Sequence, residues 1–511
     1  MTLLFTRSRS GLLAFAVADV VFWGLLLYAD KTSKTRLHLV ARSSYQPKTN
    51  STILLPFFLL HFSFFLIVFF NGSYVSQIDK YFTLQGLSDR FTHKEIQSPA
   101  PVATPSGTLL EVGGTESGKI RKFVWQGAIN AWRGSWKNFL IGTGTETYAF
   151  AFYQYRPAGH NLTSEWDFLY NKAHNEYLNY LATTGIFGLG GYFLLVGGFV
   201  VWFVRTQISN LNDQQGVKIS KWSLSSGFWV LNIALFASWL SILVTNFFGF
   251  SVVVMQIFFF LIPAFLFTMT DDDHKRKEFI KQLSFPEPYR KIASIVFVGI
   301  SLILIYRIFS YWQADTLFAS GYRLSRAGAY EKAQSLFSQA IQRNHNEPMY
   351  HDELGTVLAG LSIQALDAQE ATNGATRAKL ALEESDKALL ISPRNVNFWK
   401  SRTKIFYALS QFDPSFLDAS IKALEQARTL SPNDPKIYYN LAVLEGQLTN
   451  YDKAVDYLLT AKALKPNYRD VYFALSVFYK EMKKPDLAKT VLQEYLTNVD
   501  PTDSEFLTQV K

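Results

Sequence analysis

Residues Pro435 to Pro466, PKIYYNLAVLEGQLTNYDKAVDYLLTAKALKP, decide the fold of the C-terminal third of the chain. Large residues, small residues and a closing proline occupy the positions of a helix hairpin: Tyr438, Leu441, Ala442, Tyr451, Ala454, Leu458, Ala461 and Pro466. A step of about 34 residues reaches an equivalent set, which is Tyr472, Leu475, Ser476, Ala488 and Leu492. Small residues let two helices cross closely, and each hairpin buries its apolar face on a neighbour.

The same pattern extends toward the N-terminus. An earlier unit contains Gly321, Gly328, Tyr330, Ala333, Phe337 and Ala340, and the pattern continues with insertions through Leu354-Gly355, Ala388, Pro393 and Trp399. It resembles the tetratricopeptide family, with roughly four to five hairpins from Asp315 to about Thr502. The resemblance implies an α-solenoid whose concave surface binds a peptide or protein partner. A spacer or cap over a membrane domain is the alternative.

The first 310 residues have a different composition. The 511-residue chain is 49% hydrophobic and 16% aromatic, which is high for a soluble protein, and the long apolar runs precede Ser310. Lys and Arg outnumber Asp and Glu by 27 to 17 before Ser310, whereas the ratio after it is 23 to 24. Membrane topology explains this basic excess without nucleic acid. Because cysteine is absent, neither disulfides nor thiolate metal sites contribute.

Six apolar segments are long enough to be membrane spans, since about 20 residues cross roughly 30 Å of hydrocarbon. They are Gly11 to Tyr28, Ile53 to Phe70, Leu181 to Val204, Gly227 to Val244, Phe250 to Phe267, and Ile292 to about Trp312. The predicted fold is therefore all-α, a transmembrane bundle of about six spans followed by the solenoid. The predicted domains are residues 1–312, with a large external loop at 71–180, and residues 313–511.

Basic residues in the short loops orient the bundle, because cytoplasmic loops retain Lys and Arg. Fourteen such residues follow spans one, three and five: Lys31, Lys34, Arg36, Arg42, Lys48, Arg205, Lys218, Lys221, Lys275, Arg276, Lys277, Lys281, Arg290 and Lys291. The opposite short segments hold only Arg7 and Arg9. We expect the N-terminus, the loop 71–180 and the repeats to face the outside of the membrane.

The external loop ends in a polar pattern at the mouth of the third span. His174-Asn175 is followed after nine residues by Gly185, and after two more by Gly188. Polar residues at a membrane exit are functional candidates, and glycines in a span permit close helix packing. The sequence therefore predicts a functional site where this loop enters the membrane.

This pattern is similar to the signature of the O-antigen ligase, O-antigen polymerase and bacterial O-oligosaccharyltransferase superfamily. Two further features agree with it. Arg9-Ser10-Gly11-Leu12-Leu13 resembles the family's Arg-x-x-x-Leu element, and Ser117-Gly118 with Arg121, Trp125 and Leu140-Ile141-Gly142-Thr143-Gly144 resembles its large-loop element. The resemblance covers roughly Phe5 to Phe267. Family members usually have more spans, so it implies that the chain corresponds to the C-terminal part of the family domain.

The resemblance implies an enzyme that moves a glycan from a polyprenyl-diphosphate carrier to an acceptor hydroxyl of a lipid, polysaccharide or protein. Arg9 and Arg121 would hold the diphosphate, because guanidinium binds phosphate oxygens as a fork. His174 would orient or deprotonate the acceptor, since imidazole accepts a proton near neutral pH. The mechanism implied is an inverting transfer that uses no metal ion or cofactor. Asn175, Arg156 and His160 are further predicted substrate-binding residues.

Each of these assignments has a structural alternative. Arg9 can be a snorkelling anchor at a helix end, and Arg121 can belong to a solvated amphipathic helix. Asp19 lies within the first predicted span and His61 within the second. A buried carboxylate is costly and usually paired, so we favour a bond from Asp19 to a neighbouring helix over a catalytic role. For the whole chain, the alternative is a non-catalytic scaffold that anchors the repeats to the membrane.

Overall fold

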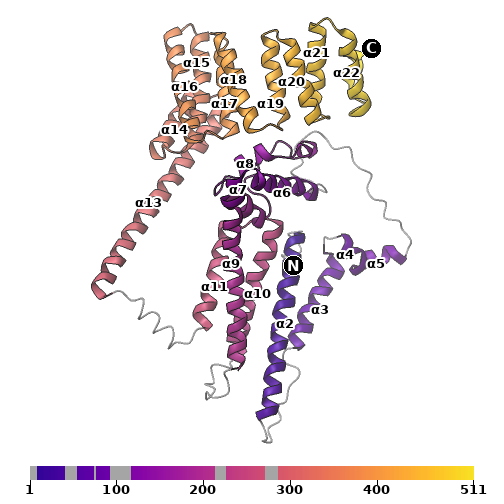
Figure 1. Ribbon diagram of the computed structural model, residues 1–511, viewed down its shortest axis with the longest axis vertical. Coiled ribbons are helices and arrows are strands. Elements are labelled where there is room, and N and C mark those ends of the chain that lie inside the picture. Colours follow the sequence, from indigo (N-terminus) through magenta and orange to yellow (C-terminus); the bar gives the residue numbers. More distant parts are fainter. Residues whose placement is uncertain are drawn as a thin grey trace. The chain divides into compact units, whose positions relative to one another are not determined.

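The computed structural model describes residues 8–40, 54–73, 76–91, 117–212, 226–270 and 286–510. Every regular element in these ranges is a helix (Figure 1), which confirms the predicted all-α class. The chain forms two compact units. The first contains residues 1–113, 137–142 and 172–281, and the second contains residues 114–136, 143–171 and 282–511.

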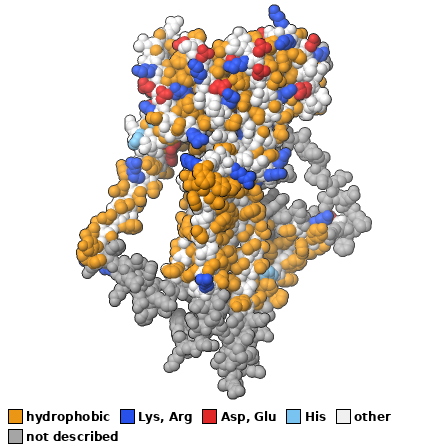
Figure 2. All heavy atoms as spheres, viewed as in Figure 1, with side chains coloured by type: hydrophobic (Ala, Val, Ile, Leu, Met, Phe, Trp, Pro, Cys, Tyr) orange, Lys and Arg blue, Asp and Glu red, His pale blue; other side chains and the backbone are white. Residues whose placement is uncertain are grey.

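The predicted apolar segments all fall on helices. They are α2 (Arg9–Val40), α3 (Leu54–Asn71), α9 (Glu176–Asn212), α10 (Ser226–Phe248), α11 (Val253–Thr270) and α13 (Glu287–Arg326). Segments of α2, α9, α10 and α13 are long and apolar enough to cross a membrane, whereas the apolar parts of α3 and α11 are shorter. Figure 2 shows hydrophobic side chains on the visible faces of these helices. Such exposed apolar surface is what a lipid-facing helix requires.

Aromatic side chains hold the helices of the first unit together. Helix α2 packs along α10, and α10 also contacts α11. Phe203 of α9 stacks on Phe236 of α10, with the ring centroids 4.0 Å apart. Trp239 of α10 is fully buried, and its indole Nε1 donates to the Phe259 carbonyl of α11 at 2.9 Å. This bond satisfies the indole in an apolar interior.

The second unit contains five successive helix hairpins. The C-terminal part of α13 pairs with α14, and the later pairs are α15 with α16, α17 with α18, α19 with α20, and α21 with α22. Their bounds are α14 (Tyr330–Arg343), α15 (Pro348–Asp367), α16 (Ala371–Ile391), α17 (Val396–Leu409), α18 (Ser415–Leu430), α19 (Pro435–Gln447), α20 (Tyr451–Leu464), α21 (Arg469–Glu481) and α22 (Pro485–Asn498). A last short helix, α23 (Ser504–Val510), contacts α22.

The residues that the sequence pattern predicts at the hairpin crossings are buried. Ala454, Leu458 and Ala461 of α20 are all fully buried. A Cβ at Gly446 would lie 2.5 Å from the ring of Phe478 in the next hairpin, so the helices approach too closely for a side chain there. These contacts are the stacking that a repeat array needs for stability.

Part of the external loop belongs to the second unit. Its helices are α6 (Ser117–Arg133), α8 (Tyr148–Tyr155) and the 3₁₀ helix η1 (Ala158–Leu162). The buried Tyr148 hydroxyl donates to the Val124 carbonyl of α6 at 2.7 Å, and Gly127 leaves space for Phe152. Compact packing thus groups these loop residues with the repeats, and α13 continues through the predicted boundary at residues 312 and 313. The predicted domain division stays a prediction.

Other loop helices lie in the first unit. They are α4 (Ser76–Phe82), α5 (Leu84–Phe91) and most of α7 (Trp136–Ile141). In α4, the Asp79 carboxylate accepts hydrogen bonds at 2.6 Å from both the backbone N–H and the hydroxyl of Ser73. These bonds tie α4 back to the end of α3.

Candidate functional site

The His174-Asn175 pair forms the entrance to α9. Asn175 is 2% exposed, and its Oδ1 accepts a hydrogen bond from the Leu178 backbone N–H at 3.0 Å. This is the bond of a helix N-cap. Asn179, one turn further along, accepts from the Ala173 N–H at 3.2 Å. The two asparagines therefore fix the backbone on both sides of His174.

His174 itself has an unusual backbone conformation and a partly exposed side chain. Its φ of 51° lies in the left-handed region, which costs a non-glycine residue about 1–2 kcal/mol. The imidazole packs edge-to-face on Phe250, with ring centroids 5.3 Å apart. A strained residue held in place by its neighbours is a feature of functional sites, and it gives this histidine a defined direction.

A buried carboxylate ties the start of α9 to the start of α11. Glu176 is 6% exposed. Its Oε2 accepts from the Ser251 N–H at 3.2 Å, and its Oε1 accepts from the Gln256 amide at 3.0 Å. The Tyr177 hydroxyl adds a bond to the Leu243 carbonyl of α10 at 2.8 Å. Sequence reasoning missed Glu176 as a site residue, although an acidic residue at a membrane mouth was a usable signal.

Gly185 bends α9. Its φ of 65° and ψ of −165° interrupt the helix, and a Cβ there would lie 2.3 Å from the carbonyl carbon of Leu140. Conversely, a Cβ on Gly142 would lie 2.2 Å from the carbonyl carbon of Thr183. The large-loop motif and the His-Asn-glycine motif are therefore in backbone contact, which only glycine permits.

The bend refines the predicted third span, which was expected as one continuous helix from Leu181. On its two sides, Tyr180 and Tyr192 stack with ring centroids 4.8 Å apart. The nine residues from Glu176 to Thr184 consequently form a short helix of their own, next to the longer apolar helix that follows Gly185. Aromatic stacking supports the bend.

The two predicted phosphate-binding arginines lie on separate elements. Arg9 is the first residue of α2, in the same unit as His174, and its side chain lies outside the described part of the structure. Arg121 is a partly exposed residue of α6, in the second unit. The convergence of these residues with His174 stays a prediction.

Asp19 and His61 form a pair between α2 and α3. The Asp19 carboxylate accepts from the Trp23 indole at 3.1 Å and lies 2.8 Å from His61 Nε2. His61 Nδ1 faces the Phe57 carbonyl at 2.7 Å and must carry a proton to bond it. Asp19 thus bonds to a neighbouring helix, as the sequence interpretation favoured.

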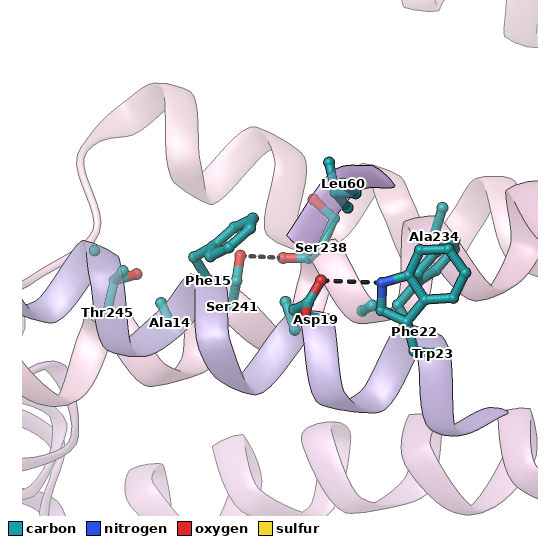
Figure 3. A pocket seen from close by; sticks show the side chains of 13 residues that line it. Ala14, Phe15, Asp19, Phe22, Trp23, Leu60, Ala234, Ser238, Ser241 and Thr245 are labelled. Atoms are coloured by element: carbon teal, nitrogen blue, oxygen red, sulfur yellow. Dashed lines mark hydrogen bonds between the residues drawn. The ribbon is translucent and has the colours of Figure 1, made fainter. Parts of the chain in front are cut away.

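A cavity of about 560 Å³ lies beside this pair (Figure 3). Its walls come from α2, α3 and α10 and are mainly small or apolar, with Asp19 and three hydroxyl side chains as polar exceptions. The lining residues are Gly11, Ala14, Phe15, Ala18, Asp19, Phe22, Trp23, Leu60, Ala234, Ala237, Ser238, Ser241 and Thr245. The first lining residue, Gly11, is two positions after Arg9 in the sequence, and the mainly apolar walls can accept an apolar group.

Arg156 and His160 are buried in the second unit. Arg156 is 3% exposed, and its guanidinium donates to the Trp166 carbonyl at 2.8 Å. His160 is fully buried, with its ring edge-to-face against Phe152 and Tyr170. Burial, with a smaller contribution from Arg156, lowers the pKa of His160 to about 3. The imidazole is therefore neutral near pH 7, and a substrate-binding role for these two residues stays a prediction.

Comparison with protein families gives two matches. Residues 1–193 match the family described as O-antigen ligase, and residues 435–468 match the tetratricopeptide repeat. The first match includes the Arg9, Arg121 and His174 motifs and the bend at Gly185. The second covers α19, α20 and the turn that follows. A comparison with curated proteins found no match.

Solved structures similar to this chain include a tetratricopeptide protein, MamA and PilF. A thermophilic tetratricopeptide protein of Thermus thermophilus is 20% identical, and the match covers 39% of this chain and 96% of that one, with a TM-score of 0.28. MamA of Desulfovibrio magneticus is 17% identical over 38% and 98% of the two chains, with a TM-score of 0.30. Pseudomonas aeruginosa PilF is 18% identical over 40% and 82%, with a TM-score of 0.30.

Proposed function

We propose that this chain, which carries an O-antigen ligase domain at residues 1–193, transfers a saccharide from a polyprenyl-diphosphate carrier to an acceptor hydroxyl. The family consists generally of membrane glycosyltransferases and ligases. The observation that carries the proposal is the matched His174-Asn175 motif, whose histidine is directed by the α9 cap and whose glycine bend contacts the large-loop motif. A partly exposed imidazole at the predicted membrane mouth suits a base that meets an incoming acceptor.

In the proposed reaction, the acceptor oxygen attacks the anomeric carbon while the bond from that carbon to the diphosphate oxygen breaks. The acceptor proton passes to the His174 imidazole, and polyprenyl diphosphate leaves with its electron pair. Attack opposite the leaving group inverts the anomeric configuration. Arg9 and Arg121 would take up the charge of the departing diphosphate, because guanidinium stays protonated and binds phosphate oxygens in pairs. No metal ion or cofactor takes part in this proposal.

The proposed location is the bacterial cytoplasmic membrane, with the loop 71–180 and the repeats on the outer side. The excess of basic residues in the alternate short loops supports this orientation. The acceptor would be a lipid, a growing polysaccharide or a protein. The repeats would recruit that acceptor or a protein partner, since solenoids present extended concave binding surfaces.

The test is a transfer assay in proteoliposomes with a polyprenyl-diphosphate-linked saccharide as donor. Arg121→Lys should reduce transfer, because an ammonium is a point charge that cannot reproduce the guanidinium fork. Lys122→Gln is the matched control on the exposed face of the same helix and should leave transfer near the wild-type rate. Equal loss in the two variants would indicate a general effect on α6 and would contradict the assigned role of Arg121.

A membrane-anchored scaffold is the second candidate, and the repeat matched at residues 435–468 favours it. A scaffold would bind its partner through the repeats without any transfer by the wild-type chain. The same proteoliposome assay separates the two functions, because a scaffold produces no glycan-modified acceptor at any donor concentration.

A further inference from the structure

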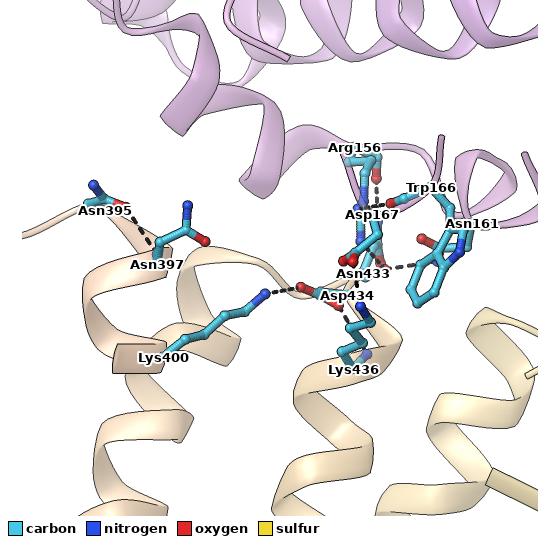
Figure 4. A network of polar contacts seen from close by, with 10 residues as sticks. All are labelled: Arg156, Asn161, Trp166, Asp167, Asn395, Asn397, Lys400, Asn433, Asp434 and Lys436. Atoms are coloured by element: carbon cyan, nitrogen blue, oxygen red, sulfur yellow. Dashed lines mark hydrogen bonds and ion pairs between the residues drawn. The ribbon is translucent and has the colours of Figure 1, made fainter. Parts of the chain in front are cut away.

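One segment of the external loop packs directly on the repeats, within the second compact unit. It runs from Tyr153 at the end of α8 to Asp167, and we refer to residues 153–167 as the loop dock. Its partners are the three turns at residues 392–395, 431–434 and 465–468. Figure 4 shows the contacts of Arg156 and Asn161 with Asn433 in the second of these turns. Each of these turns follows the second helix of a hairpin. In an alternating array such turns all lie on one edge, so the loop dock follows that edge across successive repeats.

Two aromatic side chains anchor the loop dock. Tyr153 is 9% exposed and belongs to an apolar cluster of repeat residues that includes Val396, Leu424 and Ile437. The Trp166 ring lies edge-to-face on Tyr468, with centroids 5.7 Å apart. Two lysine ammonium groups also approach the Trp166 ring, at 4.5 Å for Lys465 and 5.0 Å for Lys436. Tyr153 is buried and Trp166 is half-buried, and aromatic anchors are the residue type that contributes most to the energetics of protein interfaces.

Reciprocal hydrogen bonds form the centre of the contact. Arg156 donates to the Asn433 carbonyl at 3.1 Å, and the Asn433 amide donates back to the Arg156 carbonyl at 2.7 Å. The Asn161 amide donates to the carbonyls of Asn433 and Leu464, at 2.9 and 3.1 Å. Leu464 is the last residue of α20, so this bond satisfies a carbonyl that the helix leaves open. Lys465 donates in return to the Asn161 carbonyl at 2.7 Å.

Exposed polar pairs surround this centre. Asp167 forms an ion pair with Lys436, and Arg394 donates to the Gln154 side chain at 3.1 Å. Aromatic anchors and paired hydrogen bonds at the centre, with exposed polar pairs at the rim, are features of a specific protein interface. Nothing in the sequence pattern of the repeats requires such a contact, since repeats bury their own faces by stacking.

We propose that the loop dock is a built-in docking element that fastens the repeat array to the loop leading into His174, so that the array moves with that loop. Six residues separate Asp167 from His174, and the seven Cα–Cα steps between them span at most roughly 25 Å when fully extended. This is less than the roughly 30 Å of a hydrocarbon core. A segment of this length cannot cross the membrane between the loop dock and His174. The role of the array in presenting an acceptor to His174 rests on the proposed function.

Crosslinking in the full-length membrane protein tests the dock. The chain has no cysteine, so paired cysteines at Asp167 and Lys436 can be joined specifically by a short bismaleimide. Asp413 lies in the turn between α17 and α18, on the edge of the array opposite to the one that the loop dock contacts. The length of one helix, about 20 Å, separates the two edges. The 167–436 pair should crosslink efficiently, whereas the 167–413 pair should not. A pair at Glu331 and Arg377, which form an ion pair within the repeats, reports that the array is folded.

Charge reversal adds a second, independent arm. A cysteine pair at Gln154 and Arg394 reports the dock while the Asp167–Lys436 ion pair is changed. Asp167→Lys and Lys436→Asp should each lower the 154–394 crosslink yield, and the double variant should restore it. Equal crosslink yields for the 167–436 and 167–413 pairs, in protein that still crosslinks at 331–377, would overturn the proposal. A double variant whose 154–394 crosslink yield is no higher than that of either single variant would also overturn it.

Transfer activity separates the dock from the proposed function. If both are right, Asp167→Lys lowers transfer and the added Lys436→Asp restores it. If the dock exists but the chain is no transferase, the crosslinks keep their pattern and no variant transfers glycan. If the chain is a transferase without the dock, transfer persists while the 167–436 yield falls to that of the 167–413 control.

Discussion

At the scale of single residues, Gly185 is a position where both the backbone conformation and a close backbone neighbour exclude a side chain. A Cβ there would meet backbone atoms of Leu140 and Ile141 within 2.5 Å, at a φ of 65°. We expect Gly185→Ala to destabilise the protein by more than about 2 kcal/mol, through steric overlap and left-handed strain. Gly190→Ala is the matched control, since nothing lies within 4 Å of its Cβ position. Thermal unfolding in detergent measures both, and equal midpoints would exclude the tight contact.

His160 gives a prediction about pH. Its folded-state pKa of about 3 lies below the ordinary 6.5, so the unfolded segment binds a proton that the folded one excludes. The contribution of the neutral His160 ring to the free energy of unfolding is fully present above pH 6.5 and is lost as the pH falls toward 3. Arg156 and Tyr170 face the ring, and neither changes charge between pH 7 and 5.

From pH 7 to pH 5 this loss amounts to about 2 kcal/mol. His160→Phe should remove that part of the acid sensitivity, because phenyl fits a site already walled by aromatic rings and does not titrate. Hydrogen exchange of residues 153–167 at the two pH values measures it. An acid sensitivity unchanged by the substitution would show that another group is responsible.

At the scale of elements, the repeat register predicts where an enlarged side chain does harm. Ala454 is fully buried at a hairpin crossing, so Ala454→Trp should overpack it and cost about 1–3 kcal/mol. Leu459, on the same helix, is 40% exposed, and Leu459→Trp should have little effect. Hydrogen exchange in α20 and α21 of the full-length protein compares them. Similar exchange in both variants would mean that the register is wrong.

The elements themselves were predictable where the signal is local. Apolar length identified the six apolar helices, and the spacing of Ala454 and Ala461 identified the hairpins. The bend at Gly185 was not predicted, because one non-helical residue within an apolar run does not change its periodicity. The loop dock was missed for a different reason. Arg156 and Asn433 lie 277 positions apart, and a pair so distant leaves no pattern in a single sequence.

At the scale of the whole molecule, the predicted topology can be tested with single cysteines. Ser504→Cys, at the start of α23, should react with an impermeant thiol reagent in intact cells. Ser43→Cys and Asp272→Cys, both outside the described residues, should react only after the membrane is opened, because they belong to the basic loops. Labelling at position 43 with protection at 504 would invert the orientation and place the repeats in the cytoplasm.

The central claim is that the chain transfers a glycan with His174 as the base. Its most direct test is the transfer rate of His174→Ala in proteoliposomes supplied with polyprenyl-diphosphate-linked saccharide. We predict a fall of roughly 10²- to 10⁴-fold, the contribution typical of a general base. His345→Ala, at an exposed position in the repeats, should transfer at the wild-type rate. Transfer by His174→Ala at the wild-type rate would contradict the assigned role of this histidine.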